Sequence, residues 1–138
     1  MLMRTEAVTL IGATRLRRGD KAPKQARAAM TCWLTTGHAV LLDAQQVVSE
    51  LVTNACTHVE GGAHREWVTV IASRGPGFLR IEVTDPGAFA SEPHIPQYAS
   101  PEIESGRGIH IVRELSDGNW GTFVNSAGHR VVWADLRC

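Results

Sequence analysis

Two neighbouring runs of alternating apolar and polar residues constrain the fold more than any other feature of the chain. "EWVTVIASR" covers residues 66–74, "FLRIEVTD" covers residues 78–85, and only "GPG" separates them. A period of two places alternate side chains on opposite sides of a strand, so each run predicts a strand with one buried face. Because the linker is so short, the two strands are expected to pair as an antiparallel hairpin.

The same arrangement recurs near the C-terminus, where "NWGTFVN" and "HRVVWADL" flank "SAG". These two runs predict a second hairpin. Residues 7–16 are rich in β-branched and small side chains and predict a further strand, which we place at an edge of the sheet. Since the strands gather in hairpins, the sheet is expected to be mainly antiparallel.

Apolar residues at helical spacing fill the segments between these strands. A first helix is predicted to open at Pro23 and to end at Gly37, because proline suits a first helical turn and glycine a helix end. A second helix is predicted over about residues 43–59, with Asp43 as its N-cap. A third is predicted in "GRGIHIVRELSDG".

The order of these elements is strand, two helices, two strands, helix, two strands. It predicts an α+β fold, a two-layer α/β sandwich in which about three helices cover one face of a mainly antiparallel sheet. With 138 residues, the chain fits a single domain over residues 1–138. Residues 86–105 hold four prolines and show neither period, which is typical of a functional lid.

Composition and charge argue against several classes of protein. Lys and Arg number 14, as do Asp and Glu, so the chain lacks the positive charge of a nucleic-acid binder. We interpret the basic run "RLRR" at residues 15–18 as a solvated connection. Three cysteines without a CxxC motif favour a reducing compartment. Without a long apolar run or a signal peptide, the chain is predicted to be cytoplasmic and to lack a membrane span.

Two polar residues stand beside the apolar stripe of the second helix. Glu50 and Asn54 are four residues apart in "VVSELVTNACTH", so they face the same way at the rim of the stripe. A carboxylate beside an amide oxygen can hold a hard divalent cation or a water bound to one. The alternative is that both side chains point to solvent or cap neighbouring backbone.

Two glycine-containing segments carry further signals. In "IEVTDPGAF" a strand ends at Asp85, whose carboxylate can accept a hydrogen bond from an exocyclic amine, while Gly87 permits close approach of a ligand. In "ESGRGIHIV" Gly106, Arg107 and Gly108 open a helix, whose unpaired N–H groups suit a phosphate. Taken singly, the first segment is also a routine turn and the second also a flexible joint.

The order and separation of these three segments resemble a known family. "ELVTNACTH", "DPGA" and "GRGIHIV" resemble the N, G1 and G2 boxes of the ATP-binding domain that type II topoisomerases, the Hsp90 chaperone, sensor histidine kinases and MutL share, the Bergerat (GHKL) fold. The small size of the chain, together with "VVSELVTNA", "ESGRGIHIVRELSD" and "VVWADL", is most similar to the bacterial anti-sigma-factor serine/threonine kinases. The resemblance covers nearly the whole chain.

This resemblance implies a role for each matching residue. Glu50 would be the general base that takes a proton from the attacking hydroxyl, and Asn54 would coordinate Mg²⁺. Asp85 would bind the adenine amino group of ATP. The remaining cofactor-binding residues would lie around the nucleotide, and they are Gly87, Gly106, Arg107, Gly108 and Ile109.

The resemblance also implies an activity and partners. The protein would transfer the γ-phosphoryl group of ATP to a serine or threonine of an antagonist protein, and as a homodimer it would sequester a sigma factor. The alternative is a module that acts by protein contact and binds nucleotide weakly or not at all. Two departures from the family favour it, since Phe89 replaces a second G1 glycine and Val131 replaces a threonine that helps to hold adenine.

Overall fold

The structure is a computed structural model that describes residues 7–57, 66–85 and 107–138. The predicted lid therefore lies outside the described residues, as do Gly87, Phe89 and Gly106. The described helices and strands, in chain order, are β1 (Thr9–Arg17), α1 (Ala22–Trp33), α2 (Leu41–Thr57), β2 (Trp67–Gly75), β3 (Phe78–Asp85), α4 (Arg107–Leu115), β4 (Trp120–Val124) and β5 (Arg130–Arg137).

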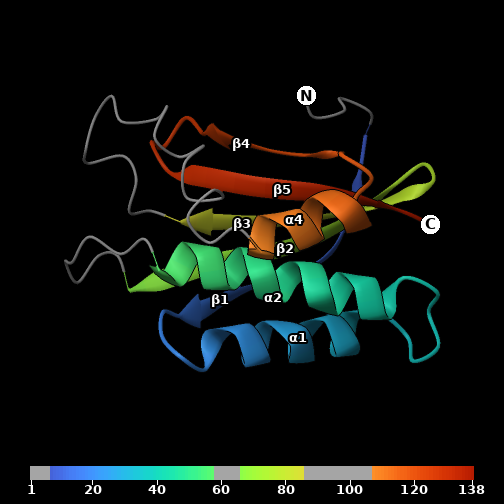
Figure 1. The fold of residues 1–138 in the computed structure, drawn as a ribbon, viewed down its shortest axis with the longest axis horizontal. Coiled ribbons are helices and arrows are strands. Elements are labelled where there is room, and N and C mark those ends of the chain that lie inside the picture. The colour runs from blue at the N-terminus through green and yellow to red at the C-terminus, as the bar shows by residue number, and fades with distance from the viewer. Residues whose placement is uncertain (1–6, 58–65, 86–106) are drawn as a thin grey trace.

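The strands form one five-stranded sheet in the order β1-β2-β3-β5-β4. Every neighbouring pair is antiparallel, and β2–β3 and β4–β5 are the two predicted hairpins. The chain crosses from β3 through α4 to β4 and returns along β5, so β5 lies inside the sheet and β4 at its edge. Figure 1 shows the helices gathered beside the sheet. These features confirm the predicted α+β sandwich, including the edge position of β1.

The core lies between the helices and one face of the sheet. Helix α2 contains no glycine or proline and buries side chains at helical spacing, and these are Ala44, Val47, Val48, Leu51, Val52 and Ala55. They pack against alternate residues of the central strands, among them Val70, Ile81 and Ala134. Each fully buried aliphatic side chain contributes about 1.5–3 kcal/mol, so this layer dominates the stability.

The ends of the first two helices differ from the prediction. Helix α1 ends at Trp33 rather than Gly37, because Leu34 takes an extended conformation that buries its side chain in the core. Helix α2 begins at Leu41, so Asp43 lies in its first turn and is not its N-cap. The imidazole of His38 instead accepts a hydrogen bond from the N–H of Val40, at 3.2 Å. At the end of α1, burial of Leu34 therefore overrides the turn signal of Gly37.

A close contact ties β1 to α1. A Cβ atom added to Gly12 would lie 2.3 Å from the ring of Trp33, far closer than two non-bonded carbon atoms approach in real structures. The indole therefore packs directly on the backbone of β1, where the pairing with β2 is irregular between Leu10 and Gly12. The glycine serves this packing.

The face of the sheet turned away from the helices carries a buried ion pair. Arg80 donates two hydrogen bonds to Asp135, at 2.8 and 3.0 Å, and its guanidinium lies 5.1 Å from the ring centre of Phe78. Glu82 shares this face. Burial raises the pKa of Glu82, the Arg80 guanidinium lowers that pKa, and the Asp135 carboxylate raises it. This face thus buries charged side chains beside the aromatic rings of Phe78 and Trp133, on the side of the sheet opposite the core.

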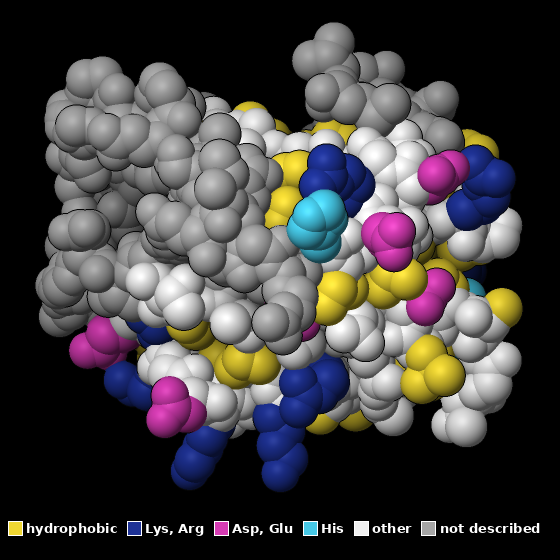
Figure 2. Space-filling model, viewed as in Figure 1, with side chains coloured by type: hydrophobic (Ala, Val, Ile, Leu, Met, Phe, Trp, Pro, Cys, Tyr) yellow, Lys and Arg dark blue, Asp and Glu magenta, His cyan; other side chains and the backbone are white. Residues whose placement is uncertain are grey.

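The surface of the helical face carries charges of both signs. Figure 2 shows Lys and Arg interspersed with Asp and Glu over the described part of this face, with several basic side chains along the edge that α1 forms. No helix within the described ranges is both long and apolar enough to cross a membrane.

Candidate functional site

The N-box helix has the polar rim that its sequence predicts. Glu50 and Asn54 are both half-buried on α2, while the flanking Val47 and Leu51 are buried in the core. One side of the helix therefore packs, and its border presents a carboxylate and an amide. Neither side chain therefore points freely into solvent.

The start of α4 lies against this rim. A Cβ atom added to Gly108 would lie 2.7 Å from Oε1 of Glu50, so the glycine leaves room for the carboxylate. Ile109, the next residue, is buried. Arg107 is the first residue of α4, and only this place in the helix is described. The fold thus brings the predicted catalytic carboxylate to the glycine-containing start of the predicted phosphate-binding helix.

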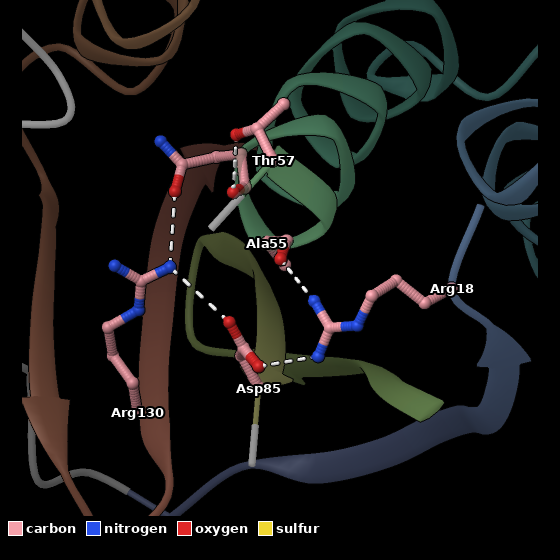
Figure 3. A network of polar contacts seen from close by, with 6 residues as sticks. Arg18, Ala55, Thr57, Asp85 and Arg130 are labelled. Carbon is pink, nitrogen blue, oxygen red and sulfur yellow. Dashed lines mark hydrogen bonds and ion pairs between the residues drawn. The ribbon is translucent and has the colours of Figure 1, made fainter. Parts of the chain in front are cut away.

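Asp85 lies at the end of β3 and is buried. Its Oδ1 accepts a hydrogen bond from the guanidinium of Arg18 at 2.8 Å, and the two side chains are only 4% and 8% exposed. Arg18 also donates a hydrogen bond to the backbone carbonyl of Ala55 in the last turn of α2, where the helix dipole favours a cation. Figure 3 shows Arg18 between the helix end and the strand end.

A second arginine reaches the same carboxylate from β5. One nitrogen of Arg130, Nη2, lies 3.2 Å from Oδ1 of Asn54 and 3.6 Å from Oδ2 of Asp85. Its side chain is 3% exposed. Asp85 therefore lies between two guanidinium groups, and Arg130 joins Asp85 to Asn54 (Figure 3). Asn54, Asp85 and Arg130 thus form one polar network with Arg18. The side chain of Asn54 is half-buried, and the other three side chains are buried.

The network corrects two interpretations of the sequence. The run "RLRR" is not wholly a solvated connection, because Arg18 is buried and pairs with Asp85. Val131 is also a poor indicator of adenine binding. It pairs with Thr84, whereas Arg130 pairs with Asp85, and adjacent side chains on a strand point to opposite faces. The residue of β5 that faces the site is therefore Arg130.

One of these two arginines could have been found from the sequence. Val132, Ala134 and Leu136 form the apolar alternation of β5, and Arg130 continues it on the same face. A charged residue in such a place requires a buried partner, which Asp85 supplies. For Arg18 the sequence carries no such signal, because the residue follows the end of β1 and its direction depends on the packing of α2.

Comparison with known protein families identifies the family of this chain. The family model for the histidine kinase-like ATPase domain matches residues 17–133, which run from the end of β1 into β5. A search of curated proteins finds no match. The chain belongs to the histidine kinase-like ATPase domain family, a family of ATP-binding domains with a general ATP-using role.

Proposed function

We propose that the protein is an ATP-dependent serine/threonine protein kinase of the anti-sigma-factor type. It would phosphorylate an antagonist protein and, as a homodimer, sequester a sigma factor. The observation that carries the proposal is the row formed by Gly108, Glu50, Asn54 and Asp85. In this row a carboxylate meets the start of α4, an amide stands one helical turn away, and an arginine links that amide to the strand-end carboxylate.

The acceptors in this row suit a magnesium nucleotide. Asn54 Oδ1 already faces a cation, Arg130, and amide and carboxylate oxygens are the ligands that Mg²⁺ prefers. Within the described parts of the chain, no three His, Cys, Asp or Glu side chains lie together as a metal site would require. Mg²⁺ bound with ATP needs only one or two protein oxygens, since phosphates and waters complete its shell.

Each residue would then have a distinct task. Bound MgATP would supply the γ-phosphoryl group, with ADP as the leaving group, and its Mg²⁺ would offset the charge that develops on the transferred group. Glu50 accepts the proton of the attacking serine or threonine hydroxyl, and Asn54 holds the metal through its amide oxygen. Asp85 accepts a hydrogen bond from the amino group of the base. The N–H groups at the start of α4, near Gly108, bind phosphate oxygens with help from the helix dipole.

A second candidate function is a module that binds its partner without phosphoryl transfer. Arg130 favours it, because this cation lies on the acceptors of both Asn54 and Asp85. Val131 lends it no support, since that side chain faces away from Asp85.

Binding and transfer separate the two candidates. Titration calorimetry would measure the binding of ATP to the purified protein with and without Mg²⁺. Transfer of label from γ-labelled ATP to a panel of purified antagonist proteins would measure the kinase reaction. We expect Glu50→Gln to abolish transfer and to retain ATP binding, while Gln46→Ala, an exposed position one turn earlier on α2, leaves both intact. ATP binding without transfer to any antagonist would support the binding module.

The contact between Gly108 and Glu50 gives a further test of the proposed base. In Gly108→Ala the new methyl group would displace the carboxylate end of Glu50, because the two would otherwise lie 2.7 Å apart. Since the flexible end of a side chain can move at little cost, we expect thermal stability close to that of the wild type and slower transfer. Unchanged transfer in this variant would argue against Glu50 as the base.

A further inference from the structure

Arg130 links two acceptors that have different tasks in the proposed nucleotide site. Its Nη2 is 3.2 Å from Oδ1 of Asn54, at the end proposed for the metal, and 3.6 Å from Oδ2 of Asp85, at the end proposed for adenine. Thus one guanidinium nitrogen approaches both ends. A metal ion bound at Asn54 and an adenine amino group bound at Asp85 would each compete with the guanidinium of Arg130.

The second arginine is held differently. Arg18 donates to Asp85 at 2.8 Å and also to the carbonyl of Ala55, at the end of α2 where the helix dipole stabilises its charge. Arg130 contacts Asp85 at the longer distance of 3.6 Å, which is beyond hydrogen-bond length. The contact from Arg130 to Asp85 is thus the longer of the two, and a ligand that displaces it leaves Arg18 as the counterion of the carboxylate.

We propose that Arg130 determines the affinity of the nucleotide site and couples the binding of the adenine amino group at Asp85 to the binding of the metal at Asn54. The inference rests on the proposed nucleotide site. Arg130 must withdraw before Asn54 can hold Mg²⁺ and before Asp85 can accept a hydrogen bond from the adenine amino group. The free energy needed to withdraw Arg130 is supplied once, by whichever of the two contacts forms first, Mg²⁺ at Asn54 or the adenine amino group at Asp85. The second contact then forms without that penalty, which is positive coupling between the amine and the metal.

The coupling can be measured with two nucleotides that differ in one group. ATP carries the 6-amino group, and purine riboside triphosphate carries hydrogen in its place. Calorimetry would give the Kd of each with Mg²⁺ and with EDTA. The coupling factor is the gain in affinity that Mg²⁺ gives ATP, divided by the gain that it gives the nucleotide without the amine. Interactions of Mg²⁺ with the triphosphate cancel in this ratio, since both nucleotides carry the same triphosphate.

We expect a coupling factor of at least about 5 in the wild type, the lower end of measured couplings between sites. In Arg130→Met the factor should fall to about 1 and MgATP should bind more tightly, because no cation covers Asn54 and Asp85. Arg137→Met is the matched control. Arg137 lies on the same strand, is exposed, and pairs with Asp117, so its removal should leave the wild-type factor.

Each result has a definite meaning. A wild-type factor near 1, an unchanged factor in Arg130→Met, or weaker MgATP binding in that variant would overturn the role of Arg130. If Arg130→Met does not fold, Arg130→Lys carries the test, because a single ammonium lacks the planar fork of arginine and should lower the factor. Failure of the proposed nucleotide site itself would look different, with no ATP binding at millimolar concentration by the folded wild type or by either variant.

Discussion

Removing the carboxylate of Asp85 should destabilise the fold strongly, whatever it does to ligand binding. Asp85→Ala would leave the guanidinium groups of Arg18 and Arg130 buried, 8% and 3% exposed, without the carboxylate that lies between them. Loss of one partner of a buried ion pair destabilises by about 3–5 kcal/mol. Domains of ordinary size have about 5–15 kcal/mol of stability, so this loss is a large fraction of the total.

The expected thermal shift follows from the size of the chain. Unfolding entropy of about 2.1 cal/mol/K per residue gives about 0.3 kcal/mol/K for 138 residues, so Tm should fall by about 10–17 °C. Urea unfolding at pH 7 measures the free energy directly. Asp85→Asn is the control, since its amide oxygen can still accept from Arg18, and it should cost less than Asp85→Ala. In an Asp85→Ala/Arg130→Met double variant, part of the loss should return.

A loss below about 1 kcal/mol in Asp85→Ala would refute this reasoning, because that value is typical of an exposed ion pair. The result also decides how binding experiments should be designed. If Asp85→Ala is largely unfolded, its failure to bind ATP says nothing about a contact with adenine. Asp85→Asn, which keeps the fold more nearly intact, is then the informative variant.

Three further perturbations test other parts of the structure. Gly12→Ala should lower stability by about 1–3 kcal/mol in urea unfolding, because its methyl group would overlap the ring of Trp33; a neutral effect would mean that the indole can move aside. Asp135→Ala should lower the stability by about 3–5 kcal/mol, whereas replacing Arg80 and Asp135 together by Met and Leu should recover most of that loss. Equal losses in the single and the double variant would contradict a buried ion pair. Burial raises the pKa of Glu82 in the folded protein, so the stability that this residue contributes is present below its ordinary pKa of 4.5 and is lost as pH rises through the raised value. Glu82→Gln should therefore gain stability relative to the wild type in thermal melts as pH rises above 4.5. A difference in Tm that does not change with pH would show that the pKa of Glu82 is not raised.

The sequence predicted the sheet better than it predicted the helix ends. Alternation in residues 66–85 identified both strands of the first hairpin, since an antiparallel strand with one buried face needs that period. The end of α1 was placed too late, because Gly37 offered a turn signal while burial of Leu34 ended the helix earlier. Long-range packing of this kind has no local signature.

The candidate site shows the same division between local pattern and tertiary contact. Short motifs located Glu50, Asn54, Asp85 and Gly108, and the fold brings them into one row. The arginines that hold the acceptors were missed, because Arg18 follows the end of β1 and Arg130 opens β5, and neither belongs to the three motifs. The apolar alternation of β5 marks Arg130 as a buried charge, whereas nothing in the sequence distinguishes Arg18 from a surface residue.

The network around Asp85 also has a consequence for how the protein folds. Arg18 and Asp85 are 67 residues apart in the chain, and Asn54 and Arg130 are 76 apart. Contacts with such long separations form late, since the loops between them must close first. During synthesis, Arg18 and Asp85 both leave the ribosome before Arg130 does. At that stage Asp85 would have only Arg18 as a counterion. Asp85 and Asn54 would become connected through Arg130 only when β5 joins the sheet.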